Sequence, residues 1–140
     1  MKTSVLFFIA GMVLLGHEGH GNKNIPESAK KLASPLTPDQ SKPELGKSAY
    51  EGACAGCHGA DGKSKTEAAA KMAHKPTNLT DHLMDSMKDG EIYWVVSNGV
   101  EKTMPAFQDK LNETERWQVV NYVRFLRSVQ KAKAPDEHHR

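Results

Sequence analysis

The stretch Cys54-Ala55-Gly56-Cys57-His58 decides what this chain of 140 residues is built around. It holds both cysteines of the sequence, and a histidine follows the second cysteine directly. A disulfide between cysteines three residues apart would close so short a loop that it would remove almost no entropy from the unfolded chain. We therefore expect the pair to serve chemistry rather than to cross-link the fold.

Two thiols at this spacing, near a helix end, can each form a thioether bond to one of the two vinyl groups of a single porphyrin. His58 then lies under the iron, where its neutral imidazole can bind on the proximal side. The motif thus predicts one covalent haem c on Cys54 and Cys57, with His58 as an axial iron ligand. Two alternatives stay open: a thiol-redox site, which requires a βαβ neighbourhood, and a zinc site, for which His74 and His82 are the central candidates for a second ligand pair.

The distal iron ligand is sought among the six methionines. Met104 stands in the loop 99–107 (GVEKTMPAF), directly before Pro105, whose ring fixes the backbone. A rigid loop can hold a thioether at the distal face, whereas the methionines in helical surroundings are expected to pack in the core. We predict Met104 as the distal ligand. His74 and His82 are the rivals, and either would give a bis-histidine iron of lower potential.

Helical periodicity accounts for most of the remaining sequence. We expect a first helix capped by Ser41, in the capping box Ser41-Lys-Pro-Glu44, and reaching about residue 53. Further helices are expected over 81–88 and 89–98, with Gly99 as a left-handed stop, and from the cap Asn112 to about residue 130. No stretch alternates as a strand would. The predicted fold is all-α, a bundle of three to five short helices around the haem, which supplements the small core of roughly 90 residues.

The N-terminal segment has the layout of a secretory signal. An apolar run from Val5 to Leu15 follows Lys2 and is too short to span a membrane. We expect residues 1–16 to be a signal peptide, cut between 16 and 21, and residues 17–40 to be a flexible linker because they are poor in apolar side chains. The folded domain is expected over 41–130 and a polar tail over 131–140. The protein is predicted to be periplasmic or otherwise exported, and its net charge of +2 is too small for a nucleic-acid-binding surface.

Several motifs together resemble the class I monohaem cytochromes c. In chain order they are Gly46-x-x-x-Tyr50, residues 54–62, Pro76-x-x-Leu79, residues 99–107 and residues 117–126. The resemblance implies thioethers at Cys54 and Cys57 and iron ligation by His58 and Met104. It also implies that the Pro76 carbonyl accepts a hydrogen bond from the other ring nitrogen of His58.

The same resemblance implies that the first helix crosses the last one, with Gly46 and Tyr50 near Tyr122. A longer loop rich in lysine and alanine, between Gly62 and Pro76, departs from the commoner spacing of the family.

The predicted function is that of a soluble, exported electron carrier, not an enzyme, because two axial ligands leave no open position on the iron. Its partners would be redox proteins that dock transiently. The alternatives are a haem c subunit of a larger respiratory or dehydrogenase complex, which contacts a membrane only if residues 1–16 are retained, and a ligand-binding haem protein with an open sixth site. Interspersed with acidic residues, five lysines flank the expected haem-contacting segments and would steer an acidic partner: Lys63, Lys65, Lys71, Lys75 and Lys102.

Overall fold

The computed structural model describes residues 25–134. The predicted signal peptide 1–16, its cleavage region, the start of the linker and most of the polar tail lie outside the described residues. Within 25–134 the chain is helical, and its β structure is limited to an isolated bridge between Val100 and Met104. The prediction of an all-α fold is confirmed. The helical elements in chain order are η1 (Glu27–Lys31), α1 (Pro43–Ala53), α2 (Ala55–His58), α3 (Glu67–Lys71), η2 (His82–Asp85), α4 (Asp89–Asn98) and α5 (Glu113–Lys133).

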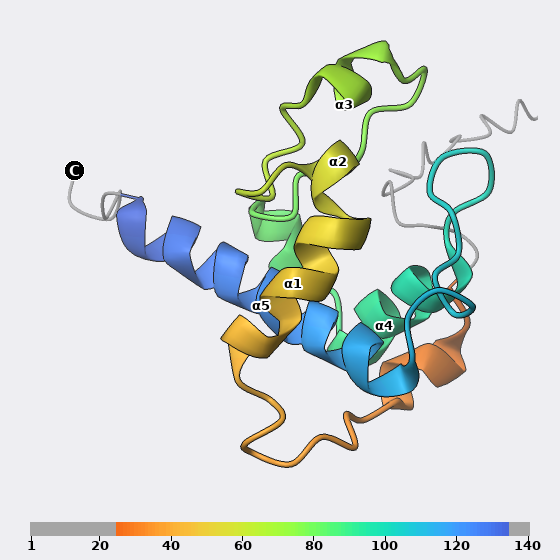
Figure 1. Ribbon diagram of the computed structural model, residues 1–140, viewed down its shortest axis with the longest axis vertical. Helices are drawn as coiled ribbons and strands as arrows, with labels where there is room; N and C mark the ends of the chain where they lie inside the picture. The colour runs from red at the N-terminus through yellow and green to blue at the C-terminus, as the bar shows by residue number, and fades with distance from the viewer. Residues whose placement is uncertain (1–24, 135–140) are drawn as a thin grey trace, which may run out of the picture.

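The crossing of α1 over α5 forms the centre of the fold (Figure 1). A Cβ atom built on Gly46 would lie 2.0 Å from the carbonyl oxygen of Gln118 and 3.1 Å from Cβ of Tyr122, so only glycine permits this approach. One turn further along α1, Tyr50 is fully buried, and its ring centroid lies 5.1 Å from that of Tyr122. The predicted crossing of the first and last helices is confirmed.

Helix α5 is defined by its cap and by its apolar stripe. The Asn112 side chain accepts a hydrogen bond from the Glu115 amide at 2.9 Å, and the Glu115 carboxylate accepts one from the Asn112 amide at 2.8 Å. The predicted cap is confirmed, and the helix runs three residues further than expected, to Lys133. The buried residues that α5 contributes to the core are Trp117, Val119, Val120, Tyr122 and Val123.

The predicted cap of the first helix is wrong. Helix α1 begins at Pro43 with Lys42 in the cap position, and no side chain caps it. The Ser41 hydroxyl donates instead to the Thr37 carbonyl at 2.9 Å. A turn over residues 38–41, in which the Ser41 amide also donates to the Thr37 carbonyl at 3.0 Å, places that carbonyl within reach, so Ser41 stabilises this turn rather than the helix.

The helices around α4 differ in detail from the prediction. In place of a helix over 81–88 there is the short 3-10 element η2, and α4 begins at Asp89 as expected. Gly99 ends α4 with a φ of 72° and a ψ of −168°. The positive φ requires glycine, but the conformation is extended rather than the left-handed helical one that we predicted.

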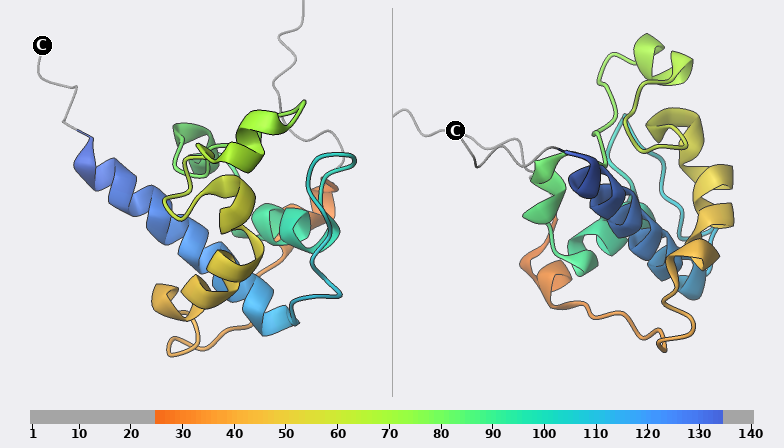
Figure 2. Two further views of the ribbon diagram at one scale, coloured as in Figure 1. Left: turned by 45° about the horizontal axis from the view of Figure 1, so that its top comes forward. Right: turned by 90° about the vertical axis from the view of Figure 1, so that its left-hand side faces the viewer.

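The described part of the predicted linker, residues 25–40, packs against the domain. Element η1 lies on α4, where a Cβ atom on Gly90 would be 2.1 Å from the Ala29 carbonyl oxygen, and Ala29 is 1% exposed. From there the segment runs to the start of α1 along the end of the molecule opposite α3 (Figure 2). The composition of residues 25–40 does not predict this packing, because the close approach requires a residue without a Cβ atom at position 90, sixty-one residues after Ala29.

No helix in the described range 25–134 is both long and apolar enough to cross a membrane.

Candidate functional site

The junction between α1 and α2 brings the two cysteines and the histidine onto one helical turn. Cys54 follows the last residue of α1 and is 7% exposed, while Cys57 and His58 lie on α2 and are half-buried. The amides of Cys57 and His58 both donate to the Cys54 carbonyl, at 3.2 and 2.9 Å. Both cysteines are free thiols. The backbone of this turn therefore sets the three side chains relative to one another.

The surroundings of the thiols do not favour thiol-redox chemistry. Burial raises the pKa of the Cys54 thiol to about 11, and the neighbouring Cys57 adds to the shift. Redox-active cysteines have lowered pKa values, because the thiolate is the reactive form. A thiol-redox site would also require a βαβ neighbourhood, and residues 25–134 contain no strand beyond the isolated bridge.

A zinc site has no second ligand pair in the part of the chain that the structure describes. Those residues contain no group of three or more His, Cys, Asp and Glu side chains placed to hold a metal ion. His74 is exposed, and the His82 side chain is 80% exposed and lies 2.9 Å from an Asp81 carboxylate oxygen. The structure therefore does not bring either histidine to the cysteine pair.

His58 is oriented by one ring nitrogen. Its Nδ1 lies 3.0 Å from the carbonyl oxygen of Thr77. Burial lowers the pKa of His58, and the hydrogen bond to Thr77 opposes this shift only in part, so the ring is neutral at pH 7. With the proton on Nδ1 donated to Thr77, the lone pair of Nε2 is left to bind a metal.

The acceptor is the carbonyl of Thr77 and not that of Pro76, which corrects our prediction by one residue. Adjacent carbonyls point in different directions along an extended chain, so the choice between them depends on how the backbone is rotated. A second donor, the Ser64 hydroxyl, also binds the Thr77 oxygen, at 2.7 Å, and fixes that rotation. Sequence spacing does not contain this information.

Side-chain hydrogen bonds from Tyr50 and Thr66 fix the backbone on either side of His58. The buried Tyr50 hydroxyl on α1 donates to the Gly59 carbonyl at 2.8 Å. The Thr66 hydroxyl donates to the Cys57 carbonyl at 3.2 Å, and its oxygen also caps α3 by accepting from the Ala69 amide at 3.0 Å. Sequence reasoning missed α3, although Thr66 followed by Glu-Ala-Ala-Ala-Lys has both a cap and strong helix formers.

Met104 lies in the loop after α4. Its amide and carbonyl pair with those of Val100 at 2.9 and 2.8 Å. The approach is close enough that a Cβ atom on Gly99 would be 2.4 Å from the Met104 carbonyl oxygen. Met104 is half-buried and packs against the core cluster to which Cys54 belongs. The structure thus brings the methionine and the first cysteine to one apolar cluster.

The donor set fits a covalently held haem. It consists of two free thiols on one turn, a neutral imidazole with one nitrogen already oriented by a carbonyl, and a thioether packed against the same core. Imidazole and thioether are common axial ligands of haem iron.

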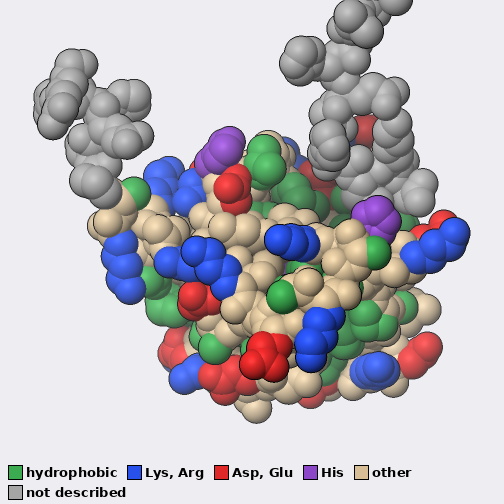
Figure 3. All heavy atoms as spheres, turned by 90° about the horizontal axis from the view of Figure 1, so that it is seen from above, with side chains coloured by type: hydrophobic (Ala, Val, Ile, Leu, Met, Phe, Trp, Pro, Cys, Tyr) green, Lys and Arg blue, Asp and Glu red, His purple; other side chains and the backbone are tan. Residues whose placement is uncertain are grey.

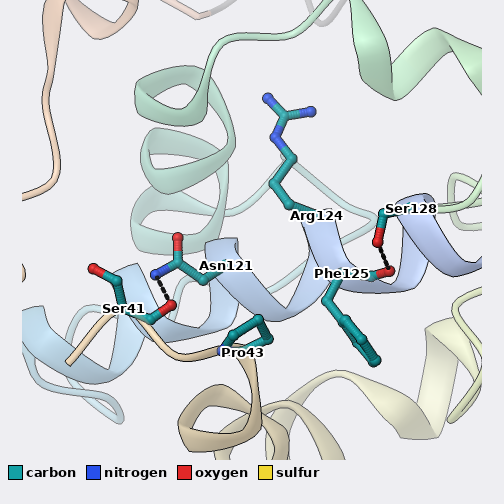
Figure 4. Close-up of a pocket in the computed structure, with 6 residues that line it drawn as sticks. All are labelled: Ser41, Pro43, Asn121, Arg124, Phe125 and Ser128. Atoms are coloured by element: carbon teal, nitrogen blue, oxygen red, sulfur yellow. Dashed lines mark hydrogen bonds between the residues drawn. The ribbon is translucent and has the colours of Figure 1, made fainter. Parts of the chain in front are cut away.

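A separate shallow pocket of about 350 Å³ lies between the start of α1 and the outer face of α5 (Figure 4). Its polar groups already have partners. The Asn121 amide donates to the Ser41 carbonyl at 3.1 Å, and the Arg124 guanidinium binds Asp89 and the carbonyls of Met84 and Met87. None of its lining residues belongs to the Cys54–His58 turn, so it forms no part of the candidate site.

The helical fold and the site together define a cytochrome c domain. Residues 41–123 match the family model described as "Cytochrome C oxidase, cbb3-type, subunit III", and the chain belongs to this family of cytochrome c domains. Among solved structures the chain is similar to the KustC0563 c-type cytochrome, with a TM-score of 0.52 and 26% sequence identity, covering 58% of this chain and 95% of that one. A search of curated proteins gave no significant match. The family is one of haem c electron carriers.

Proposed function

We propose that this domain carries one haem attached through Cys54 and Cys57, that His58 and Met104 bind its iron, and that it passes single electrons between redox proteins outside the cytoplasm. The observation that carries the proposal is the single turn holding both thiols beside a half-buried, neutral His58. When bound, the haem supplies a one-electron iron couple.

The chain's own residues attach, orient and shield the group. Each thiol would add its S–H across a vinyl C=C of the haem, the sulfur to one carbon and the hydrogen to the other, so no atom would be lost. His58 contributes Nε2, while the Thr77 carbonyl holds the ring in one orientation and raises its basicity. Met104, held by its bridge to Val100, would supply the second ligand to the iron. Ligation by both side chains would leave no site for a substrate on the metal, which supports an electron carrier over an enzyme.

The proposal of export is supported by the sequence of residues 1–16 and by the family, because c-type cytochromes are generally exported. Partners are expected to dock briefly, through small interfaces. Basic and acidic side chains are interspersed on the face at the α3 end of the molecule (Figure 3). Of the five lysines considered for steering, Lys102 lies 3.7 Å from the Glu101 carboxylate. We therefore expect only mild steering of an acidic partner.

A second candidate function is a fixed haem c subunit of a respiratory complex. The description of the matched family, which names a subunit of the cbb3-type oxidase, favours it. Fractionation of the native host distinguishes the two. A carrier is recovered in the exported soluble fraction with residues 1–16 removed, whereas a subunit co-purifies with membranes and larger polypeptides.

Absorption spectra of wild type, Met104→Ala and Met72→Ala, made in cells that attach haem, test the proposed site. Met72 is half-buried like Met104 but follows α3, so it is a matched control. We expect haem that stays with the denatured polypeptide in all three proteins. The weak long-wavelength band of a methionine–iron bond should vanish only in Met104→Ala.

Absence of covalent haem from the wild type would contradict the proposal as a whole. A band that persists in Met104→Ala would contradict the distal assignment and turn attention to His74 or His82. Carbon monoxide binding to the reduced wild type at neutral pH would support an open sixth site instead.

A further inference from the structure

The hydrogen bond that orients His58 has a third participant, Ser64. The Ser64 hydroxyl oxygen lies 2.7 Å from the Thr77 carbonyl oxygen, to which it donates, and 3.4 Å from Nδ1 of His58. The same carbonyl oxygen lies 3.0 Å from Nδ1. One acceptor therefore serves two donors, the serine hydroxyl and the imidazole N–H.

The backbone holds the Ser64 hydroxyl in this position. The Ser64 amide donates to the His58 carbonyl at 2.8 Å, so the residue is tied to the histidine at both its main chain and its side chain. Its φ is 56°, in the left-handed region that residues other than glycine seldom adopt. Such a conformation persists only where the surrounding contacts determine it. Two residues on, Thr66 secures the same segment to the Cys57 carbonyl.

Ser64 lies in the lysine- and alanine-rich loop between Gly62 and Pro76, whose length departs from the commoner family spacing. Through the contacts of Ser64 with His58 and Thr77, this loop takes part in the candidate haem site, which the length of the loop does not predict.

We propose that Ser64 is a positioning residue that weakens the hydrogen bond from His58 to Thr77 and thereby raises the reduction potential of the domain. The inference rests on the proposed ligation of iron by His58. A carbonyl oxygen has two lone pairs, and engaging one of them with the hydroxyl makes the oxygen a poorer acceptor for the second donor. A weaker Nδ1–H bond leaves the imidazole a weaker electron donor to the metal, which favours the reduced state.

The test compares haem-loaded wild type with Ser64→Ala and Ser64→Gly. Both variants remove the hydroxyl, but alanine keeps the backbone strain whereas glycine relieves it. Ser128→Ala is the matched control, since the Ser128 hydroxyl also donates to a carbonyl, that of Phe125, at 2.7 Å on the distant part of α5. The readouts are the equilibrium reduction potential and the proton chemical shift of His58 Nδ1–H in the reduced protein.

Both Ser64 variants are expected to lower the potential, shifting the ratio of oxidised to reduced protein at a fixed applied potential by about threefold toward the oxidised form. The Nδ1–H resonance should move to lower field, as its hydrogen bond to Thr77 strengthens. Ser128→Ala should leave the potential and the resonance unchanged.

An unchanged or raised potential in both Ser64 variants would overturn the inference. So would a lowered potential in Ser64→Gly alone, which would assign the effect to relief of the backbone strain rather than to loss of the hydroxyl. These results leave the proposed function standing, because the wild type still carries haem and its methionine band. A wild type without covalent haem would refute the proposed function and this inference together.

Discussion

Replacing Gly46 with alanine is expected to disrupt the α1–α5 crossing, whereas the same change at Gly52, the other glycine of α1, is not. The new Cβ atom would lie 2.0 Å from the carbonyl oxygen of Gln118 and 2.6 Å from its carbonyl carbon. Both are backbone atoms of α5, so no side chain can turn aside to make room. The two helices must move apart by about 1 Å in a core that is packed at crystal density.

Two opposing effects set the expected change in the free energy of unfolding of Gly46→Ala. Overpacking a core by a methyl group costs about 1–3 kcal/mol, and the rigid backbone neighbour here places the cost toward the upper end. Alanine gains roughly 0.5–1 kcal/mol over glycine in a helix interior. We therefore expect Gly46→Ala to lower the free energy of unfolding by about 2 kcal/mol.

Gly52 provides the control on the same helix. A Cβ atom there would meet nothing within 4 Å, so Gly52→Ala should show only the propensity gain and raise the free energy of unfolding by about 0.5–1 kcal/mol. The assay is urea unfolding of the haem-loaded proteins, followed by far-ultraviolet circular dichroism. Equal stability of Gly46→Ala and wild type, or equal changes in both variants, would refute the argument from close approach.

Three further outcomes are expected. Tyr50→Phe leaves the Gly59 carbonyl without its buried donor and should lower the free energy of unfolding in urea by about 1–2 kcal/mol; no loss would show that another donor replaces the hydroxyl. Hydrogen bonding to Arg127 lowers the pKa of Asp85 in the folded state, so the pair stabilises the fold above the ordinary aspartate pKa of about 4, and the stability is lost as the pH falls through the folded pKa. Urea titrations at a series of acidic pH values should therefore show a shallower loss for Asp85→Asn than for wild type, and parallel curves would contradict this. Gly99→Ala forces a positive φ on alanine and a clash with the carbonyl of the proposed distal ligand, so the methionine band should weaken in the oxidised spectrum; an unaltered band would show that the loop adapts.

Local signals predicted most of the fold. The helices at 89–98 and from 113 onward follow from apolar periodicity and from the cap at Asn112, whereas the helix at 43–53 was predicted from a capping box at Ser41 that does not form. The Gly46 crossing was predicted from a family resemblance, and its physical basis is the contact with α5 described above. The position of the cysteines and His58 on one turn follows from their adjacency in sequence.

The features that the sequence did not predict depend on contacts outside the motif from which each prediction was made. The Ser41 side chain has two competing partners, a backbone amide of the helix and the Thr37 carbonyl, and it donates to the carbonyl. The packing of Ala29 needs the empty space at Gly90. The choice of Thr77 over Pro76 depends on a hydroxyl thirteen residues away, on Ser64. In each case the motif allows two outcomes, and a contact with a residue outside the motif selects one.

The two proposed ligands are restrained to different degrees. His58 is held through the Thr77 carbonyl, through Ser64 and through its own helical turn, so displacing it breaks contacts in several segments. Met104 is held by a bridge to Val100, only four residues away, within a loop that rejoins α4 through two backbone hydrogen bonds. Opening that loop therefore breaks few contacts, and regions with few contacts open at the lowest free energy. Met104, the proposed distal ligand, is accordingly less firmly held than His58, and its displacement would leave the contacts of His58 intact.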